Sequence, residues 1–484
     1  MSLSSALANA LTGLTSNARA AGVVSSNLAN LYTPGYGRRD VELSPISRGA
    51  SGGVRVLGVT RYMDQGLLAD RRGADGALGH AKTTATFFKR LEQVIGTPEA
   101  AGSLSARIAA FDAALTTAAS RPEAPERLSE VVARAREVIG SLNGAAQDIQ
   151  ARRQAAEGDI AKAVDTLNSS LKQVERLNFD IQEARLRGQD VSSLQDQRQV
   201  VIDRIAEIVP VREVPRDLGT VGLVTTGGAV LLDRVAVDLS FERANVIVAD
   251  MTLANGSLNG LEINGQIVPT SGGSTPMQGG RLAALFDLRD AQTVDAQAQL
   301  DALTRNLVER FQDAGLDTTR GVGDPGLFTD GGAAFAAVDE VGLSERIALN
   351  VLVDPQAGGA TWRLRDGLGA AVPGPEGDAT LLLAYGDALR QPRVLASGGI
   401  ASGAASLAGH ASTMISQFGQ LRLTEEQNVT FASARRNELE NMLLQDGVDS
   451  DVETQRLLQI EQAYSANARL IQTVDEMMNA LLRI

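Results

Sequence analysis

One glycine-rich stretch of the sequence has the spacing of a phosphate-binding loop. Residues 321–326 read GVGDPG, which matches the G-x-G-x-x-G fingerprint of dinucleotide-binding proteins. That fingerprint follows a strand and opens a helix, whose N-terminus then faces the pyrophosphate. Here the stretch follows an expected helix, contains Pro325 and leads into FTDGG. We therefore interpret it as a turn-rich loop, and we expect no cofactor.

Carboxylates gather near the C-terminal end of the chain, where a cation could bind. Asp446, Asp449, Asp451 and Glu453 lie close together, but the EF-hand spacing and its downstream Glu are missing. The chain has two histidines, which stand apart and without ligand spacing, and no cysteine. We interpret the carboxylates as an acidic helix start that complements the helix dipole. No metal site is expected.

Catalytic motifs are missing from the rest of the sequence. It contains no Walker A, G-x-S-x-G or H-E-x-x-H pattern, and its many carboxylate pairs do not single out one site. Trp362 is most simply the anchor of an apolar core. We expect that the protein is not an enzyme. The open alternative is an activity housed in one of the β-rich regions described below, which would need a pocket with converging polar groups.

Length and charge exclude several classes of protein. The 484 residues suffice for about three domains. A net charge of −13 without a basic stripe argues against nucleic acid and against an anionic membrane surface as partners. No apolar stretch is long enough to predict a transmembrane helix, and no secretory signal peptide opens the chain. Any export is expected to use another signal.

The first residues of the chain have the heptad pattern of an interacting helix. Steps of four and three from Leu3 to Leu31 give an apolar seam with one Asn. The helix is expected to stop before Pro34, because the residue before a proline is pushed out of the helical region. The predicted contact residues are Leu3, Leu7, Leu14, Asn17, Val24, Leu28, Asn30, Pro34, Gly35 and Tyr36.

The last residues repeat this pattern. Gly447 breaks the preceding helix, and SDVE at residues 450–453 matches a capping box. The predicted contact residues are Leu457, Ile460, Tyr464, Asn467, Ile471, Val474, Met478 and Leu481. Two terminal seams with one Asn each are suited to pair with each other and with further copies of the chain. The simpler alternative is that both helices pack on the body of their own chain.

The middle of the chain alternates between helical and strand-like patterns. Helices are expected over residues 80–119, 128–181, 192–208, 281–312 and 407–444, with start signals at 120–123, 192–195 and 424–427. The heptad seam of 128–181 slips by one residue near 152–158, which indicates one long helix or two end to end. Short β-type runs between Gly-rich turns are expected at 221–226, 230–232, 235–239, 246–248, 347–353 and 361–364.

These patterns predict a mainly α fold with β inserts (α+β), which has terminal coiled-coil helices, a long-helix body and two outward β-rich regions. Residues 1–45 and 446–484 would form a terminal coiled-coil domain. Residues 46–209, 281–317 and 401–445 would form a helical body. Residues 210–280 would form a β-rich domain, and residues 318–400 a second β-rich region or part of the same outer domain.

Both ends of the chain also resemble one protein family. SNLANLYTPGY at residues 26–36 resembles the N-terminal signature N-x-A-N-x-x-T-P-G-[YF] of bacterial flagellar rod and hook axial proteins. EQAYSANARLIQTVDEM at residues 461–477 resembles their C-terminal signature. The resemblance covers roughly the first 60 and last 60 residues, and Gly37 departs from the Ser or Thr that relatives often carry. The long helical body is most similar to the hook-filament junction members of the family.

The resemblance implies a structural adaptor between hook and filament, assembled as a ring of about eleven copies. It implies export through the flagellar type III apparatus, and hence a transient stay in the cytoplasm before location in the extracellular flagellum. The implied partners are identical subunits, the hook protein, the second junction protein (hook-associated protein 3) and an export chaperone. The chaperone is expected to hold the C-terminal seam at Ile460, Tyr464, Ile471, Val474 and Met478. Alternatives are another axial protein of hook or rod type, or a cytoplasmic coiled-coil scaffold.

Overall fold

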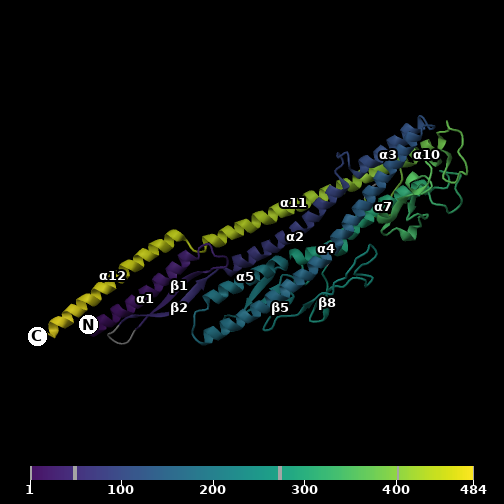
Figure 1. The fold of residues 1–484 in the computed structure, drawn as a ribbon. Coiled ribbons are helices and arrows are strands. Elements are labelled where there is room, and N and C mark those ends of the chain that lie inside the picture. The colour runs from purple at the N-terminus through teal and green to yellow at the C-terminus, as the bar shows by residue number, and fades with distance from the viewer. Residues whose placement is uncertain (1–2, 47–51, 271–274, 401–402, 483–484) are drawn as a thin grey trace.

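The computed structural model is an elongated, mainly helical molecule (Figure 1). It describes residues 3–46, 52–270, 275–400 and 403–482. The two termini lie at one end of the long axis, and the segment around α10 lies at the other. The chain therefore runs out along the molecule and returns. This confirms the predicted fold class of terminal helices, a long-helix body and small β inserts.

The terminal end consists of two antiparallel helices and a hairpin. Helix α1 (Leu3–Ala29) packs against α12 (Ser450–Leu481), and the antiparallel hairpin of β1 (Arg38–Pro45) and β2 (Val54–Tyr62) lies along α1. Helix α1 ends five residues before Pro34, two residues earlier than the seam pattern suggested. The hairpin was not predicted, because charged residues interrupt the apolar alternation of both strands.

Long helices form the body of the molecule. They are α2 (Gln65–Ile95), α3 (Leu104–Ala119), α4 (Pro125–Leu186), α5 (Ser192–Ile208), α6 (Gly280–Asp287), the π-helical turn Leu288–Gln292, α7 (Thr293–Gln312) and α11 (Leu407–Gln445). Helix α2 packs along α11, while α3 and α5 pack on α4. The predicted seam of α4 is buried from Leu128 to Ile181. The expected helix 80–119 is two helices, because Gly96 (φ 89°) ends α2.

Helix α4 is one continuous helix of 62 residues, so the seam slip does not divide it. The slip instead marks two buried charges, Arg153 and Glu157. Arg153 Nε donates to the carbonyl of Arg289 at 2.9 Å, and Arg289 Nη1 donates to Glu157 Oε2 at 2.7 Å. Arg289 and Glu157 are fully buried, so this ion pair and the hydrogen bond of Arg153 replace apolar packing at this level of the body.

A β insert lies along α4 on the outside of the body (Figure 1). One antiparallel sheet has the order β3 (Val211–Pro215), β4 (Val221–Thr225), β5 (Val230–Leu232). A second has the order β6 (Leu239–Ser240), β7 (Leu261–Ile263), β8 (Gln266–Val268). Of the run expected at 235–239 only Leu239 lies in a strand, and the run expected at 246–248 is not a strand. They are held instead by side chains of α4, since Glu175 accepts from the Ala236 amide and Gln154 from the Ile247 amide.

The segment 318–400 carries less sheet than its sequence suggested. Its elements are β9 (Phe328–Asp330), α8 (Leu343–Arg346), β10 (Ile347–Leu349), α9 (Arg363–Asp366) and α10 (Thr380–Arg390). Strands β9 and β10 form one antiparallel pair. The run expected as a strand at 361–364 enters α9 instead, and Trp362 is half-buried beneath the Arg363 guanidinium rather than a core anchor.

Several helix starts differ from their sequence signals. Asp449, not Ser450, caps α12 by accepting from the amides of Asp451 and Val452. Thr424 lies inside α11, where its hydroxyl donates to the carbonyl of Gln420 at 3.0 Å. Helix α4 begins at Pro125 and α5 begins without a side-chain cap. Short polar residues bond to helix interiors as readily as to helix starts, so a Ser or Thr signal alone is ambiguous.

The glycine-rich stretch 321–326 forms a loop between α7 and β9, as its turn residues predicted. The Gly321 amide donates to Asp324 Oδ2 at 2.7 Å, so the loop closes on its own carboxylate. Within the described residues, no group of three or more His, Asp or Glu is placed to hold a metal ion. No helix of the described chain is both long and apolar enough to cross a membrane.

Candidate functional site

The two helices with heptad seams form one antiparallel pair. Asn467 of the α12 seam lies against Gly13 of α1, where an added Cβ would come 2.9 Å from Asn467 Nδ2. Val24 and Val474 are buried. The half-buried residues of the predicted set are Leu3, Leu14, Asn17, Leu28, Asn30, Gly35, Tyr36, Leu457, Ile460, Asn467 and Ile471. Each seam therefore has an intramolecular partner along part of its length.

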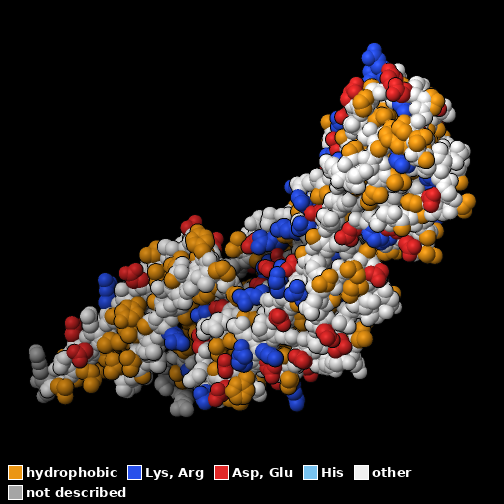
Figure 2. Space-filling model, turned by 45° about the vertical axis from the view of Figure 1, so that its right-hand side comes forward, with side chains coloured by type: hydrophobic (Ala, Val, Ile, Leu, Met, Phe, Trp, Pro, Cys, Tyr) orange, Lys and Arg blue, Asp and Glu red, His pale blue; other side chains and the backbone are white. Residues whose placement is uncertain are grey.

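A large part of the apolar surface of this pair stays exposed. The exposed residues of the predicted set are Leu7, Pro34, Tyr464, Met478 and Leu481. The exposed residues that sequence reasoning missed include Leu11, Leu458, Leu470 and Met477, which lie outside the heptad positions. We call the exposed side chains of α1 and α12 the outer apolar surface: Leu7, Leu11, Leu458, Tyr464, Leu470, Met477, Met478 and Leu481. Figure 2 shows hydrophobic side chains gathered over the terminal end.

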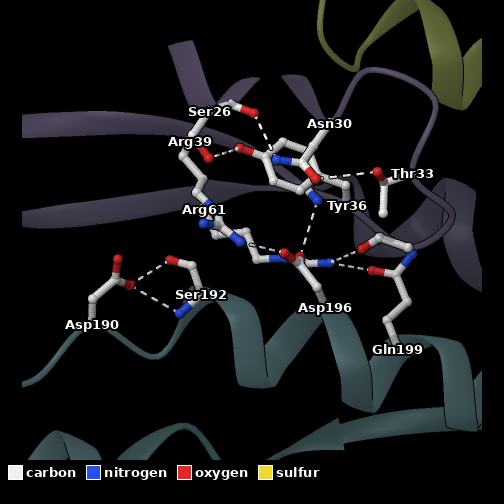
Figure 3. A network of polar contacts seen from close by, with 12 residues as sticks. Ser26, Asn30, Thr33, Tyr36, Arg39, Arg61, Asp190, Ser192, Asp196 and Gln199 are labelled. Carbon is white, nitrogen blue, oxygen red and sulfur yellow. Dashed lines mark hydrogen bonds and ion pairs between the residues drawn. The ribbon is translucent and has the colours of Figure 1, made fainter. Parts of the chain in front are cut away.

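The end of α1 is fixed by a polar network around Asn27. Figure 3 shows the neighbouring residues Tyr36, Arg39 and Asn30 of this network. The Asn27 side chain is fully buried. Its Oδ1 accepts from the Tyr36 hydroxyl at 2.9 Å and from the Arg39 amide at 3.0 Å, and its Nδ2 donates to the Arg39 carbonyl at 2.9 Å. Thr33 donates to Asn30 Oδ1 at 3.1 Å. The turn after α1 is thus tied to the last turn of the helix. We call residues 30–37 the corner.

Asp196 of α5 joins the corner to the body. Its Oδ1 accepts from the Gly37 amide at 3.0 Å and from Arg61 Nε at 2.7 Å, and its Oδ2 accepts from Arg39 Nη2 at 2.6 Å. Arg61 also donates to the Gly35 carbonyl and to Gln199. A half-buried carboxylate that accepts from two guanidinium groups and an amide makes a strong local anchor.

Two glycines permit this close approach. Gly35 has φ 78°, and a Cβ there would come 2.6 Å from Val200 Cγ2 of α5. At Gly37 a Cβ would come 2.5 Å from Arg61 Nε. Gly37, the departure from the family signature, therefore makes room for the guanidinium that binds Asp196.

Two ion pairs join the hairpin to α12. Arg38 Nε lies 3.2 Å from Glu453 Oε1, and Glu453 is 1% exposed. Arg456 donates to both carboxylate oxygens of Asp40 at 2.7 Å, and this hydrogen bonding raises the pKa of Arg456. Glu453, considered above as part of an acidic helix start, thus holds β1 against α12. The three parts of the terminal end are linked to one another and, through Asp196, to α5.

A cleft of about 680 Å³ lies between the corner, the start of α2 and the link between α11 and α12. Tyr32 and Pro34 of the corner line one side, and Leu443, Leu444 and residues 445–451 line the other. The chain passes between the α1–α12 helix pair and the body at the corner and at the link between α11 and α12. Sequence reasoning found the corner but not its partners, since Asp196 and Arg61 lie far from it in sequence and match no motif. Tyr36, predicted as a contact residue, bonds to Asn27 of its own chain.

Comparisons with known proteins match both the body and the C-terminal end. The family model described as the flagellar hook-associated protein FlgK helical domain matches residues 88–327. The model described as the flagellar basal body rod FlgEFG protein C-terminal matches residues 440–484.

Individual relatives have related names. Flagellar hook-associated protein 1 of Salmonella typhimurium is 26% identical over 285 residues, which are 54% of this chain and 51% of the relative. Flagellar hook-associated protein 1 of Escherichia coli is 23% identical over 341 residues, 66% of this chain and 59% of the relative. The chain thus spans about half the length of the curated relatives it matches. The solved flagellar hook junction protein FlgK of Burkholderia pseudomallei is 22% identical, with TM-score 0.46, over 55% of this chain and 47% of that chain.

Proposed function

Because this chain belongs to the family of flagellar hook-associated proteins, we propose that it is a structural adaptor that joins the hook to the filament in the bacterial flagellum. The observation that carries the proposal is the terminal helix pair. It is built as a unit, anchored to the body by Asp196, and yet leaves the outer apolar surface uncovered. Exposed apolar surface of this kind is typical of interaction sites.

The outer apolar surface is the contact between copies. Its side chains, with Leu7, Tyr464, Met478 and Leu481 from the predicted set, pack against the terminal pairs of neighbouring subunits. In this proposal about eleven copies close the ring, and the terminal pairs form its inner tube. The seam residues between α1 and α12, including Val24, Asn467 and Val474, act within one subunit and set the register of the pair.

The body and the inserts form the outer part of the junction. Residues 46–209, 281–317 and 401–445 contact the bodies of adjacent subunits, while residues 210–280 and 318–400 face outward. The neighbours along the axis are the hook protein on one side and hook-associated protein 3 on the other. The protein leaves the cytoplasm through the flagellar type III apparatus and is located in the extracellular flagellum. Its role is structural and not catalytic.

An export chaperone holds α12 before assembly. Of the five predicted chaperone residues, Tyr464 and Met478 are exposed, whereas Ile460 and Ile471 are half-buried and Val474 is buried. A chaperone that contacts all five must displace α1. Deletion of residues 3–29 should therefore tighten chaperone binding, measured by titration calorimetry. Unchanged affinity would mean that the chaperone uses the exposed face alone.

Deletion of the gene tests the adaptor function. Cells that lack the protein should build hooks without filaments and release flagellin into the medium, and a plasmid copy should restore filaments. Normal filaments in the deletion strain would reject the proposal. The second candidate, another axial protein of hook or rod type, is favoured only by the C-terminal match at residues 440–484. It predicts that the deletion also removes the hook.

A further inference from the structure

A basic hollow lies on the body, separate from the corner cleft. It has a volume of about 560 Å³ and is bounded by α2, α4, α5, α6 and α11. The cations that line it are Lys82, Arg204, Arg281 and Arg436, and the carboxylates are Asp75 and Glu207. Figure 2 shows Lys and Arg side chains, with Asp and Glu side chains among them, beside a hollowed stretch midway along the molecule. We call this site the basic hollow.

Three of its four cations have no partner in the described part of the chain. Arg436 pairs with Asp75 and Glu440, but Lys82, Arg204 and Arg281 make no side-chain ion pair or hydrogen bond there. All three are exposed. Elsewhere on the body, Arg side chains commonly pair with acids, and the chain as a whole has an excess of acids. Like charges that face one space repel each other, so an anionic partner would stabilise the site.

The same chain carries a segment of matching charge. Residues 437–455 contain six carboxylates and no Lys or Arg. Glu440 and Glu453 are used in ion pairs within the subunit, and Asp449 caps α12. Glu438, Asp446 and Asp451 are exposed and make no side-chain ion pair in the described chain. We call the residues 446–451 between α11 and α12 the acidic link.

We propose that the basic hollow of one copy receives the acidic link of the neighbouring copy. The proposal rests on the assembly of identical subunits proposed above, and it names the surfaces that pair. Each copy carries both halves at different places, so the contact is heterologous and repeats from copy to copy, as rings and helical arrays require. Asp446 lies ten residues beyond Arg436 in the sequence, which is about 15 Å along a helix. Copies in a closed ring are related by a rotation without a rise, so the two paired surfaces must lie at the same height along the ring axis. The pairing therefore requires that α11 be inclined to that axis.

Cysteine crosslinking tests this pairing directly, because the natural chain has no cysteine. The double variant Arg204→Cys with Asp446→Cys is expressed in the deletion strain, and isolated flagella are treated with a bis-maleimide. The pairing predicts a ladder of dimers, trimers and larger products. Either single variant alone should give no ladder. The matched control is Lys172→Cys with Asp446→Cys, since Lys172 is an exposed cation on α4 outside the hollow.

The outcomes separate this inference from the adaptor function. Filaments that form with only monomeric double variant, or with an equal ladder from the Lys172 control, overturn the pairing and leave the adaptor function standing. Failure of the unsubstituted chain to restore filaments counts against the adaptor function. Charge reversal gives a second readout: Arg281→Glu should remove filaments from most cells, and adding Asp446→Arg should restore them. Loss without restoration assigns the hollow to a different anionic partner and rejects the pairing.

Discussion

Asn467 of α12 rests against Gly13 of α1, and a Cβ on Gly13 would come 2.9 Å from Asn467 Nδ2. The Gly13→Leu variant should therefore push the helices apart, whereas Gly13→Ala requires only a small shift of the Asn467 amide. Limited proteolysis of the purified protein, followed by mass spectrometry of the cleaved ends, measures the release of α12. Gly22→Leu is the control, because Gly22 has no heavy atom within 4 Å of an added Cβ. Equal cleavage of both Leu variants would contradict the contact.

Removal of the Asn27 side chain should loosen the hairpin. Asn27→Ala leaves the Tyr36 hydroxyl and both main-chain groups of Arg39 without their partner. The expected cost to local stability is about 3 kcal/mol, since buried polar groups lose their hydrogen bonds. Tyr36→Phe removes the bonds of the hydroxyl to Asn27 and Ser26 but leaves those of Arg39, and it should cost less, about 2 kcal/mol. Hydrogen exchange of the amides of β1 measures both effects. Faster exchange in Tyr36→Phe than in Asn27→Ala would mean that Asn27 is not the centre of the hydrogen-bond network.

The corner should not accept a side chain at its left-handed glycine. Gly35→Ala combines an unfavourable φ of 78° with a contact of 2.6 Å to Val200. Gly323→Ala has a similar φ, 88°, but open space around it. Backbone strain alone costs about 1 kcal/mol. Any further loss in the free energy of unfolding of Gly35→Ala, compared with Gly323→Ala, therefore measures the contact with α5. Urea denaturation gives both values, and equal losses would mean that α5 does not constrain the corner.

Much of this architecture can be predicted from local sequence, but the polar contacts that join its elements cannot. The heptad spacing of the seams from Leu3 and from Leu457 is visible in neighbouring residues, so both helices and their pairing could be expected. Asp196 and the corner meet only because α5 lies beside it, across more than 150 residues of sequence. Likewise, the seam slip of α4 does not predict that the partners of Arg153 lie in other elements. Polar contacts between distant segments depend on the fold itself.

The pH dependence of stability should reveal the buried Asp301. Its carboxylate accepts from the Ser344 hydroxyl and amide, the Gly342 amide and Gln297, yet burial raises its pKa above the ordinary 3.8. The folded state therefore binds the proton more tightly than the unfolded state does. Stability contributed by this group rises as pH falls through the raised pKa and levels off below 3.8. Urea midpoints of the natural chain, relative to Asp301→Asn, should increase with falling pH. If the difference between the two urea midpoints decreased with falling pH, the pKa of Asp301 would be lowered and not raised in the folded state.

Asp366 should behave in the opposite way. The hydrogen bond from Arg365 lowers the pKa of this carboxyl below 3.8, so its contribution is present at neutral pH. That contribution is lost as pH falls through the lowered pKa, because the proton then competes with Arg365. Asp366→Asn should be less stable than the natural chain at pH 7, and the gap should close in acid. A gap that does not change with pH would mean that the ion pair adds nothing.

The position of the protein in the flagellum tests the adaptor role most directly. Antibodies against the body, with gold labels, can be applied to hook–filament complexes released from cells and imaged by electron microscopy. The adaptor role predicts one labelled band at the boundary between hook and filament, and no label on complexes from the deletion strain. Label along the rod, hook or filament, or protein found only in the cytoplasm, would contradict it.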